Sequence, residues 1–557
     1  MQLFPEARDA HQINHILSSP HFKNALDKME RRCQKYRSTP IQSLPFSLYR
    51  KFFLDGDRRS YEDIYFERRG RLSYLALSIL LHHRPEDILA LEDAIWAICE
   101  ENTWVLPAHT SDLGTHYNTA VIDLFSAETG FALSEIIYLI GDELDEKIVH
   151  RIKECLEERI FQMYLTHTYT WENVSMNWAA VCAGCVGGAF LYCAPERFHL
   201  VHDRIITTMN KFLEGFGDDG ICLEGIHYWG YGFGFFTYFA QLLFEFTDGK
   251  ENLFDNPICQ KTAFFQESAF LRQNQTISFS DGFQTSDFLP GLTNKLHALY
   301  GSKLQPMKYA AFSDYCHRFP AYLRNFFWVS SATDTPNTTE VSYKYFPTAQ
   351  WYISTGKVLS FVAKGGHNDE PHNHNDIGSF ALVCDAGQIL CDYGAGEYTR
   401  DYFLPETRYN YLCNSSFGHS VPIINGAGQC PGKQHCSNVL HYDADGITID
   451  ITKAYTDDRL TSAIREIKLS ESTFSLKDTF SGHDLQITER FVTMISPTLD
   501  GNRLCVGDYV LENSSSVIPR ISSETILSHE SHPETLYMID YEIGQEGVFL
   551  LTVNPKK

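Results

Sequence analysis

The chain has 557 residues, more than one hydrophobic core usually organises, so at least two domains are expected. Hydrophobic residues make up 43% and charged residues 21% of the sequence, as in an ordinary soluble globular protein. The net charge of −24 argues against nucleic acids and anionic membranes as general partners, although a locally basic cleft could still bind a polyanion.

The N-terminal sequence and the cysteines together indicate a cytoplasmic protein. No basic segment followed by an apolar one begins the chain, and no apolar run approaches about 18 residues, so we expect neither a signal peptide nor a transmembrane span. The 15 cysteines are odd in number and follow no framework, which fits a reducing compartment. The close pair Cys182-x-x-Cys185 lies among small residues and predicts tight helix packing.

The pattern of the chain changes near residue 335. Before this point the periodicity is helical, and helices are expected at about 71–81, 85–98, 119–140, 145–165, 176–193 and 198–214. After Asp334-Thr335-Pro336-Asn337, short alternating runs with turn residues predict strands, for example at 357–362, 388–391 and 446–451. Helices followed by strands predict two domains of different class, a helical one over 1–335 and a β domain over 336–557.

Two helical segments of the first domain carry polar groups near their starts. Asn173 or Ser175 is expected to cap a helix that has Asn177 in its first turn. A Gly-rich approach that begins at Asp218 leads into the aromatic, helical sequence that contains Tyr228. The N–H groups and the dipole at a helix N-terminus favour anions. Taken singly, each residue can also be read as a capping residue or a core-edge tyrosine.

The segment from Gly366 to Phe380 holds three histidines and three carboxylates directly ahead of an apolar run. Imidazoles two residues apart in extended backbone share one side of the chain. His372 and His374 can therefore offer two nitrogens at once to a metal or an anionic substrate. A solvated loop that is merely rich in histidine is the alternative reading of this motif alone.

Several motifs, in this order and spacing, resemble the heparinase II/III-like polysaccharide lyases over about residues 60 to 430. They are Phe66-Glu67-x-x-x-Arg71-Leu72, Trp104-x-Leu106-Pro107-Ala108-His109, Ile122-Asp123-Leu124-Phe125-x-Ala127-Glu128-Thr129, Asn177-Trp178, Glu224-Gly225-x-x-Tyr228-Trp229-x-Tyr231-Gly232 and His372-x-His374-x-Asp376-x-Gly378-Ser379-Phe380. The resemblance implies a multidomain α+β protein with an N-terminal (α/α) toroid followed by a C-terminal antiparallel β-sandwich. It also implies β-elimination of polysaccharides that contain uronic acid.

The implied chemistry explains why these residue types are needed. Removing the C5 proton of a uronate builds charge on a carboxylate that is already anionic, so hydrogen-bond donors must neutralise it. Asn177 supplies amide donors and His372 an imidazole N–H. Tyr228 is expected to act as base and acid, which requires surroundings that help it ionise, because a free tyrosine has a pKa near 10. His372 is the alternative base.

The resemblance also implies a metal site made of His374, Asp392 and His419. Two imidazoles, one carboxylate and a water suit tetrahedral zinc, expected here to be structural. If Ala386-Gly387 forms a two-residue hairpin turn, Asp392 faces Ala381 and not His374. The loop His372–Asp376, called the histidine loop below, must then curl back over its own strand for the site to form. A glycine at 378 permits that bend.

Two rival classes stay open. A glycoside hydrolase on an (α/α) toroid would need two flanking carboxylates, with Asp281 opposed to Asp218, Asp219 or Glu224; a non-catalytic sugar-binding protein would need none. Unsaturated products would decide for the lyase. The expected partner is an anionic glycosaminoglycan chain or oligosaccharide, and a homodimer is one assembly that the sequence leaves open. Further residues expected to contact the substrate are His109, His116, Glu224, Tyr231, Arg400 and Arg408.

Overall fold

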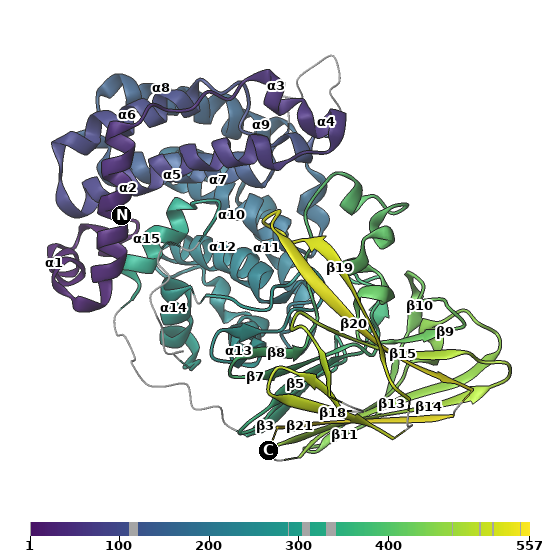
Figure 1. Ribbon diagram of the computed structural model, residues 1–557. Helices are drawn as coiled ribbons and strands as arrows, with labels where there is room; N and C mark the ends of the chain where they lie inside the picture. Colours follow the sequence, from purple (N-terminus) through teal and green to yellow (C-terminus); the bar gives the residue numbers. More distant parts are fainter. Residues whose placement is uncertain are drawn as a thin grey trace. The chain divides into compact units, whose positions relative to one another are not determined.

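The computed structural model describes most of the chain (Figure 1). The described residues are 2–110, 121–287, 289–303, 312, 314–329, 341–470, 472–500, 503–514, 517–545 and 547–556. The chain divides into two compact units. The first comprises Met1–Gly215, Tyr228–Ala263 and Asp287–Thr335, and the second comprises Phe216–His227, Phe264–Ser286 and Pro336–Lys557. Two segments that precede residue 335 thus belong with the β unit.

The first unit is built from helices, coloured purple to teal in Figure 1. The helices described along the chain are α1 (Ala10–Ser18), α2 (Lys23–Ser38), α3 (Phe46–Tyr49), α4 (Lys51–Asp55), α5 (Arg59–His82), α6 (Pro85–Cys99), α7 (Leu124–Ile140), α8 (Glu146–Leu156), α9 (Gln162–Thr166), α10 (Asn177–Cys193), α11 (His202–Leu213), α12 (Gly225–Phe246), α13 (Pro257–Ala269), α14 (Pro290–Tyr300) and α15 (Phe319–Phe327). The division between the units falls inside α12 and α13.

Helices α7 and α10 form the centre of the helical unit, because both are buried on nearly every side. A Cβ added at Gly188 would lie 2.4 Å from the ring of Phe131, so the two helices pack backbone against side chain. Cys182 and Cys185 are fully buried in α10, which confirms the predicted tight packing. The stretch Leu124–Glu143 is long and apolar enough to cross a membrane, but 72% of its apolar window is buried, as in the core helix of a globular protein.

The second unit consists of antiparallel sheets, coloured green to yellow in Figure 1. Its strands are β1 (Phe270–Arg272), β2 (Gln275–Thr276), β3 (Ser342–Phe346), β4 (Trp351–Thr355), β5 (Ser360–Lys364), β6 (His367–Asn368), β7 (Phe380–Cys384), β8 (Gly387–Leu390), β9 (Pro422–Ile424), β10 (Gly432–Cys436), β11 (Asn438–Tyr442), β12 (Gly446–Asp450), β13 (Leu460–Ser470), β14 (Thr473–Gly482), β15 (Ile487–Thr493), β16 (Thr498–Asp500), β17 (Arg503–Val506), β18 (Tyr509–Asn513), β19 (Arg520–Leu527), β20 (Pro533–Gly544) and β21 (Val548–Pro555).

The strands form three main sheets that share one hydrophobic core. Their strand orders are β3-β4-β5-β7-β8, β11-β12-β13-β14-β21-β18-β17-β16 and β19-β20-β15-β9. β13 alternates buried with more exposed residues because one face meets the core. β5 and β7 are buried on both faces, and β7 is a continuous apolar run. The predicted class, helices first and antiparallel sheets afterwards, is confirmed.

The hairpin ahead of Asp392 differs from the prediction in its register. The turn between β7 and β8 is formed by Asp385-Ala386, one residue earlier than expected, and a bulge follows between the pairs Val383–Gln388 and Leu382–Leu390. Asp392 lies beyond the end of β8, so it does not pair with Ala381. The turn uses Asp385, which favours turns, and leaves Gly387 with a φ of 136° at the start of the strand.

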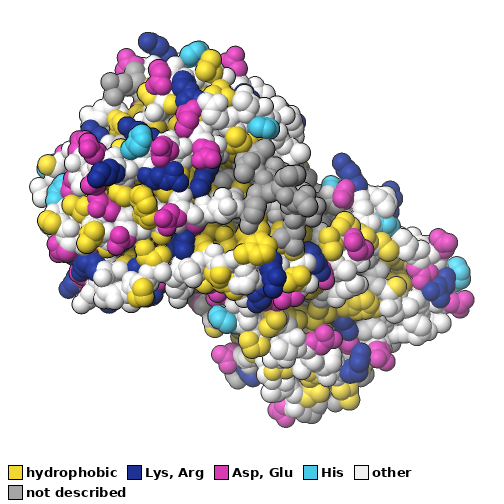
Figure 2. Space-filling view, turned by 90° about the horizontal axis from the view of Figure 1, so that it is seen from above, with side chains coloured by type: hydrophobic (Ala, Val, Ile, Leu, Met, Phe, Trp, Pro, Cys, Tyr) yellow, Lys and Arg dark blue, Asp and Glu magenta, His cyan; other side chains and the backbone are white. Residues whose placement is uncertain are grey.

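The face of the protein shown in Figure 2 carries acidic and basic side chains interspersed. No broad field of a single sign covers the described part of this face, despite the net charge of −24. A specific cluster of side chains must therefore provide any recognition of an anionic substrate, because a chain with a net charge of −24 does not attract anions in general.

Candidate active site and metal centre

His372 is held in the second unit by a buried carboxylate. It lies in the loop between β6 and β7 and has a φ of 57°, a left-handed conformation uncommon for a residue with a Cβ. Its Nδ1 lies 2.6 Å from Asp281 Oδ2, and its Nε2 lies 3.5 Å from Glu224 Oε1. Because a carboxylate only accepts, the Nδ1 that faces Asp281 carries the proton.

The two partners shift one another's ionisation in opposite directions. Burial by itself would lower the pKa of His372, but the hydrogen bond to Asp281 and the charges of Asp281 and Glu224 raise it above its ordinary value. Burial would raise the pKa of Asp281, but the hydrogen bonds from His372 and His374 hold it well below its usual range. The pair therefore favours a cationic ring beside an ionised carboxylate.

Two further side chains complete the surroundings of Asp281. The Tyr402 hydroxyl lies 2.5 Å from Asp281 Oδ1, and the Arg408 guanidinium lies 3.6 Å from Oδ2. Arg408 also donates from Nε to the carbonyl of Asn373 at 3.0 Å, so it fixes the backbone of the histidine loop. Arg408 is only 9% exposed, and it also donates from Nη1 to the carbonyl of Tyr402 at 3.3 Å.

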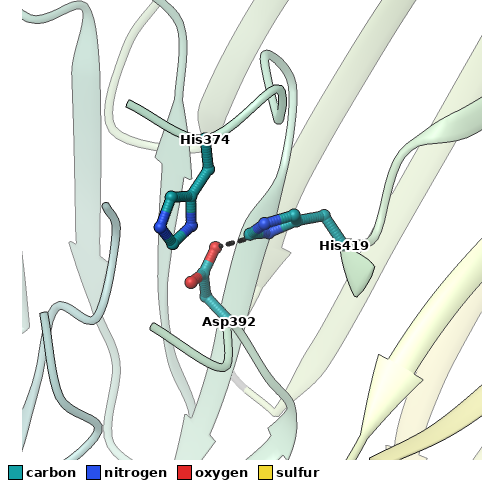
Figure 3. Close-up of side chains that lie close together, drawn as sticks. All are labelled: His374, Asp392 and His419. Carbon is teal, nitrogen blue, oxygen red and sulfur yellow. Dashed lines mark hydrogen bonds and ion pairs between the residues drawn. The ribbon is translucent and has the colours of Figure 1, made fainter. Parts of the chain in front are cut away.

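The same loop brings His374 together with Asp392 and His419, the three residues expected to form a metal site. One ligand atom of each lies within 4.8 Å of the others, and all three residues are buried. Figure 3 shows the three side chains pointing toward one another, with His419 Nδ1 3.1 Å from Asp392 Oδ2. The bend that makes this possible occurs at Gly378, whose φ is 86°.

The residues present fit a metal ion. His374 Nε2 faces Asp281 Oδ1 at 3.0 Å, and its buried Nδ1 has no hydrogen-bond partner among the described residues. His419 Nε2 lies 2.8 Å from the carbonyl of Cys413, so its Nδ1 is the atom turned to Asp392. Burial lowers the pKa of His374 to about 4, so this imidazole is neutral, the form that binds metals. Outer partners that orient ligand histidines in this way are usual at metal sites.

In the first unit, Asn177 is the first residue of α10 and is buried. The predicted caps Asn173 and Ser175 are wrong: Met176 occupies the N-cap position and makes no side-chain hydrogen bond there. An added Cβ at Gly232 would lie 3.1 Å from the Cα of Asn177, so α12 approaches the start of α10 closely. The glycine permits this approach, because a larger side chain would push the two helices apart.

His109 lies beside the same helix start. Its Nδ1 is 2.8 Å from Asp123 Oδ2, and its ring lies edge-on to Trp178 with centroids 4.9 Å apart. Asp123 also caps α7 through the backbone N–H of Ser126. The ring of His109 is thus oriented by the same carboxylate that begins a core helix.

Tyr228 and Tyr231, near the start of α12, differ in their surroundings. Both are partly exposed, and Tyr228 follows Glu224 by four residues along the chain. The Tyr231 hydroxyl donates to Glu128, and the Arg318 guanidinium lies 4.1 Å from the Tyr231 ring centroid. Burial and the charge of Glu128 raise the pKa of Tyr231 well above its usual value, so Tyr231 is unsuited to act as a base.

Two of the expected substrate contacts are not part of these clusters. His116 lies outside the described residues. Arg400 has a partly exposed side chain whose Nε contacts the adjacent Asp401 at 3.0 Å. Two contacts, by contrast, were not predicted from the sequence: Asp281 holds His372, and Tyr402 contacts Asp281. The turn Ser280-Asp281-Gly282, in which Ser280 has a φ of 58°, was the one local signal at Asp281.

Comparison with known proteins places the fold. No protein-family model matches the sequence, and no curated protein matches it. Among solved structures, the heparan sulfate lyase HepC from Pedobacter heparinus is similar at 13% identity, with 100% of this chain and 92% of that chain covered and a TM-score of 0.57. The chain shares the fold of polysaccharide lyases.

Two further lyases extend the comparison. The chondroitin AC lyase of Streptomyces coelicolor A3 has 12% identity and a TM-score of 0.58, with 99% of this chain and 82% of that chain covered. A Paenibacillus xanthan lyase has 11% identity and a TM-score of 0.53, with 97% of this chain and 58% of that chain covered. The predicted architecture, an (α/α) toroid followed by an antiparallel β-sandwich, is therefore confirmed. At these identities the likeness establishes the fold, and the chemistry has to be argued from the site.

We expect removal of the metal to lower thermal stability before it alters chemistry, since His374, Asp392 and His419 are buried. An ion present at about a hundred times its dissociation constant stabilises a protein by roughly 3 kcal/mol. Native mass spectrometry should show one bound ion, and chelation should lower the melting temperature. The variant His374→Gln is the control, because added zinc should no longer raise its melting temperature. A metal-free native protein with unchanged melting after chelation would contradict the prediction.

Proposed function

We propose that the protein is a polysaccharide lyase that cleaves uronic-acid-containing glycosaminoglycan chains or oligosaccharides by β-elimination, leaving a 4,5-unsaturated uronate. The observation that carries the proposal is the placement of His372 between the carboxylates of Asp281 and Glu224. Both ring nitrogens face groups that only accept hydrogen bonds, so the ring is suited to donate. A donor of this kind is what an elimination next to a carboxylate requires.

In the proposed reaction, His372 and the amide of Asn177 donate to the uronate carboxylate and neutralise its charge. This makes the C5 proton acidic enough to be removed, because the developing negative charge is spread onto oxygens that already have donors. Asn177 supports this role as the first residue of a helix without a side-chain cap, where the helix dipole also favours an anion.

Tyr228 is proposed to remove the C5 proton and to protonate the leaving glycosidic oxygen. Both Tyr228 and Tyr231 are partly exposed, but the hydroxyl of Tyr231 is bound to Glu128. A tyrosine that acts in both steps must ionise more readily than a free one, whose pKa is near 10. The donors that bind the substrate carboxylate would supply part of the positive environment that this requires.

The contacts of Asp281 argue against the hydrolase alternative. A general acid or nucleophile needs an oxygen directed at the substrate. Asp281 is 1% exposed, and its two oxygens accept from His372, His374 and Tyr402. Its role is therefore to hold these three side chains in place.

The structural metal is proposed to be zinc, bound by His374, Asp392 and His419 with water as a fourth ligand, where it would hold the histidine loop. The cytoplasmic location and the homodimer stay predictions.

The proposal is tested with a panel of uronate oligosaccharides, which includes heparan-type, chondroitin, hyaluronan and alginate chains. A lyase forms a conjugated product whose ultraviolet absorbance rises with each cleavage. We expect absorbance to rise with at least one glycosaminoglycan substrate. New reducing ends without absorbance would indicate a hydrolase, and binding without any product would indicate a sugar-binding protein.

Tyr228→Phe is expected to abolish turnover while the melting temperature changes little. The substitution removes one oxygen and keeps the ring, so packing should change by less than about 1 kcal/mol. Substrate affinity should stay near normal, as for an interaction made only in the transition state. Tyr231→Phe should show the opposite pattern, a lower melting temperature with most turnover kept, because it leaves buried Glu128 without that donor. Reversed results for the two tyrosines would assign the base to Tyr231.

His372→Ala and Asn177→Ala are each expected to lower kcat by on the order of a hundredfold, because each removes a donor to the developing charge. His367→Ala, in the neighbouring strand β6, is the matched control and should keep most of the activity. The variants are compared by steady-state kinetics on the best substrate of the panel, with circular dichroism to check folding. Near-normal turnover in a folded variant would remove that residue from the mechanism.

A further inference from the structure

Asp281 contacts both His372 and His374, which have different proposed roles. Oδ2 accepts from His372 Nδ1 at 2.6 Å, and Oδ1 accepts from His374 Nε2 at 3.0 Å. His372 is the proposed donor to the substrate, and His374 is one of the three residues of the metal site. The two are separated by a single residue, yet they present opposite edges of their rings to the same carboxylate.

For His374, this contact decides which nitrogen can bind a metal. A carboxylate only accepts, so the Nε2 that faces Asp281 carries the proton, and the lone pair of the neutral ring is on Nδ1. That Nδ1 is buried and has no hydrogen-bond partner in the described part of the chain. It is directed at Asp392 and His419 (Figure 3). Without Asp281, either tautomer and either ring orientation would be open to His374.

For His372, the same reasoning leaves Nε2 as the nitrogen that can donate to the substrate. Its Nδ1–H is engaged by Asp281, so Nε2 is the atom turned away from the carboxylate, toward Glu224 at 3.5 Å. A ring that is fixed at one nitrogen can present the other in a single direction. This matters because misplacing a catalytic group by about 1 Å can cost on the order of a hundredfold in rate.

The carboxylate is itself held rigidly. Ser278 Oγ donates to the carbonyl of Asp392 at 2.8 Å, and the N–H of Ala395 donates to the carbonyl of Gly282 at 3.0 Å. The turn that carries Asp281 is thus bonded on both sides to the segment that supplies a metal ligand. The Tyr402 hydroxyl, 2.5 Å from Oδ1, adds a third donor.

We propose that Asp281 is the positioning residue of this site, and that its one carboxylate directs His372 Nε2 to the substrate and His374 Nδ1 to the metal. The catalytic half of this inference rests on the lyase function proposed above, whereas the metal half does not. A single substitution at Asp281 should therefore affect two properties that are otherwise separate.

The experiment measures kcat, KM and zinc affinity in four variants of the full chain, with zinc affinity taken from competition with a chelator. Asp281→Asn should lower kcat by about a hundredfold with little change in KM. It should also weaken zinc binding by about tenfold to a hundredfold, as loss of a partner that orients a ligand histidine does. His367→Ala is the control. It replaces a histidine of β6 that contacts neither Asp281 nor the three metal-site residues, so both properties should stay within about threefold of the native values.

His372→Gln and His374→Gln separate the two halves and keep Asp281 in place. We expect His372→Gln to lose turnover and to bind zinc with near-native affinity, and His374→Gln to lose zinc binding. If Asp281→Asn does not fold, the zinc affinity of His372→Gln decides the matter. Loss of both properties in His372→Gln would show that His374 depends on His372 and not on Asp281, and would overturn the proposal.

The remaining outcomes are equally decisive. An Asp281→Asn variant that folds and loses only turnover, only zinc binding or neither would overturn the shared role. If no substrate of the panel is cleaved by the native protein, the lyase function fails, but the zinc measurement on Asp281→Asn still tests the orientation of His374. Failure of the positioning role and failure of the proposed function are therefore distinguishable.

Discussion

A carboxylate removed from water destabilises a protein by several kcal/mol unless donors surround it, and Asp281, at 1% exposure, is such a group. Its donors come from segments far apart in the chain, with His372 91 residues away and Tyr402 121 residues away. These segments can satisfy the carboxylate only if the loop ahead of β7 curls back, which the left-handed residues His372 and Gly378 allow. The position of both histidines of the motif thus follows from the need to satisfy one buried charge.

A second buried cluster, centred on Arg465, fixes the backbone at the end of this loop. Arg465 in β13 is fully buried, pairs with Asp478 and Glu489, and donates to the carbonyls of Gly378 and Ser420 at 2.8 and 2.6 Å. Arg465 therefore connects the end of the histidine loop and the residue after His419 to strand β13. Breaking one partner of such a cluster leaves a buried charge unpaired, which is costly. The sheets supply a rigid base, and the polar chemistry lies in the loops that they carry.

Much of the fold was predictable because its signals are local. Helical periodicity marked α5, α6, α10 and α11 to within a few residues except at the start of α5, and alternation located the strands, with β5 beginning three residues later than expected. The register of the β7–β8 turn and the Met176 cap were not predictable, since each depends on which backbone groups the surrounding structure satisfies. Residues of the metal site came from the resemblance of short motifs, and their convergence required the bend at Gly378.

The sequence by itself determined the order of helices and sheets, the small-residue helix α10 and the identity of the histidine motif, because periodicity and composition act over short stretches of chain. Only the tertiary structure decided that Asp281 serves His372 and His374 together, and that Tyr231 is bound to Glu128, 103 residues away. No local pattern specifies such pairs. They arise because buried polar groups must find partners wherever the packed chain brings a donor within reach.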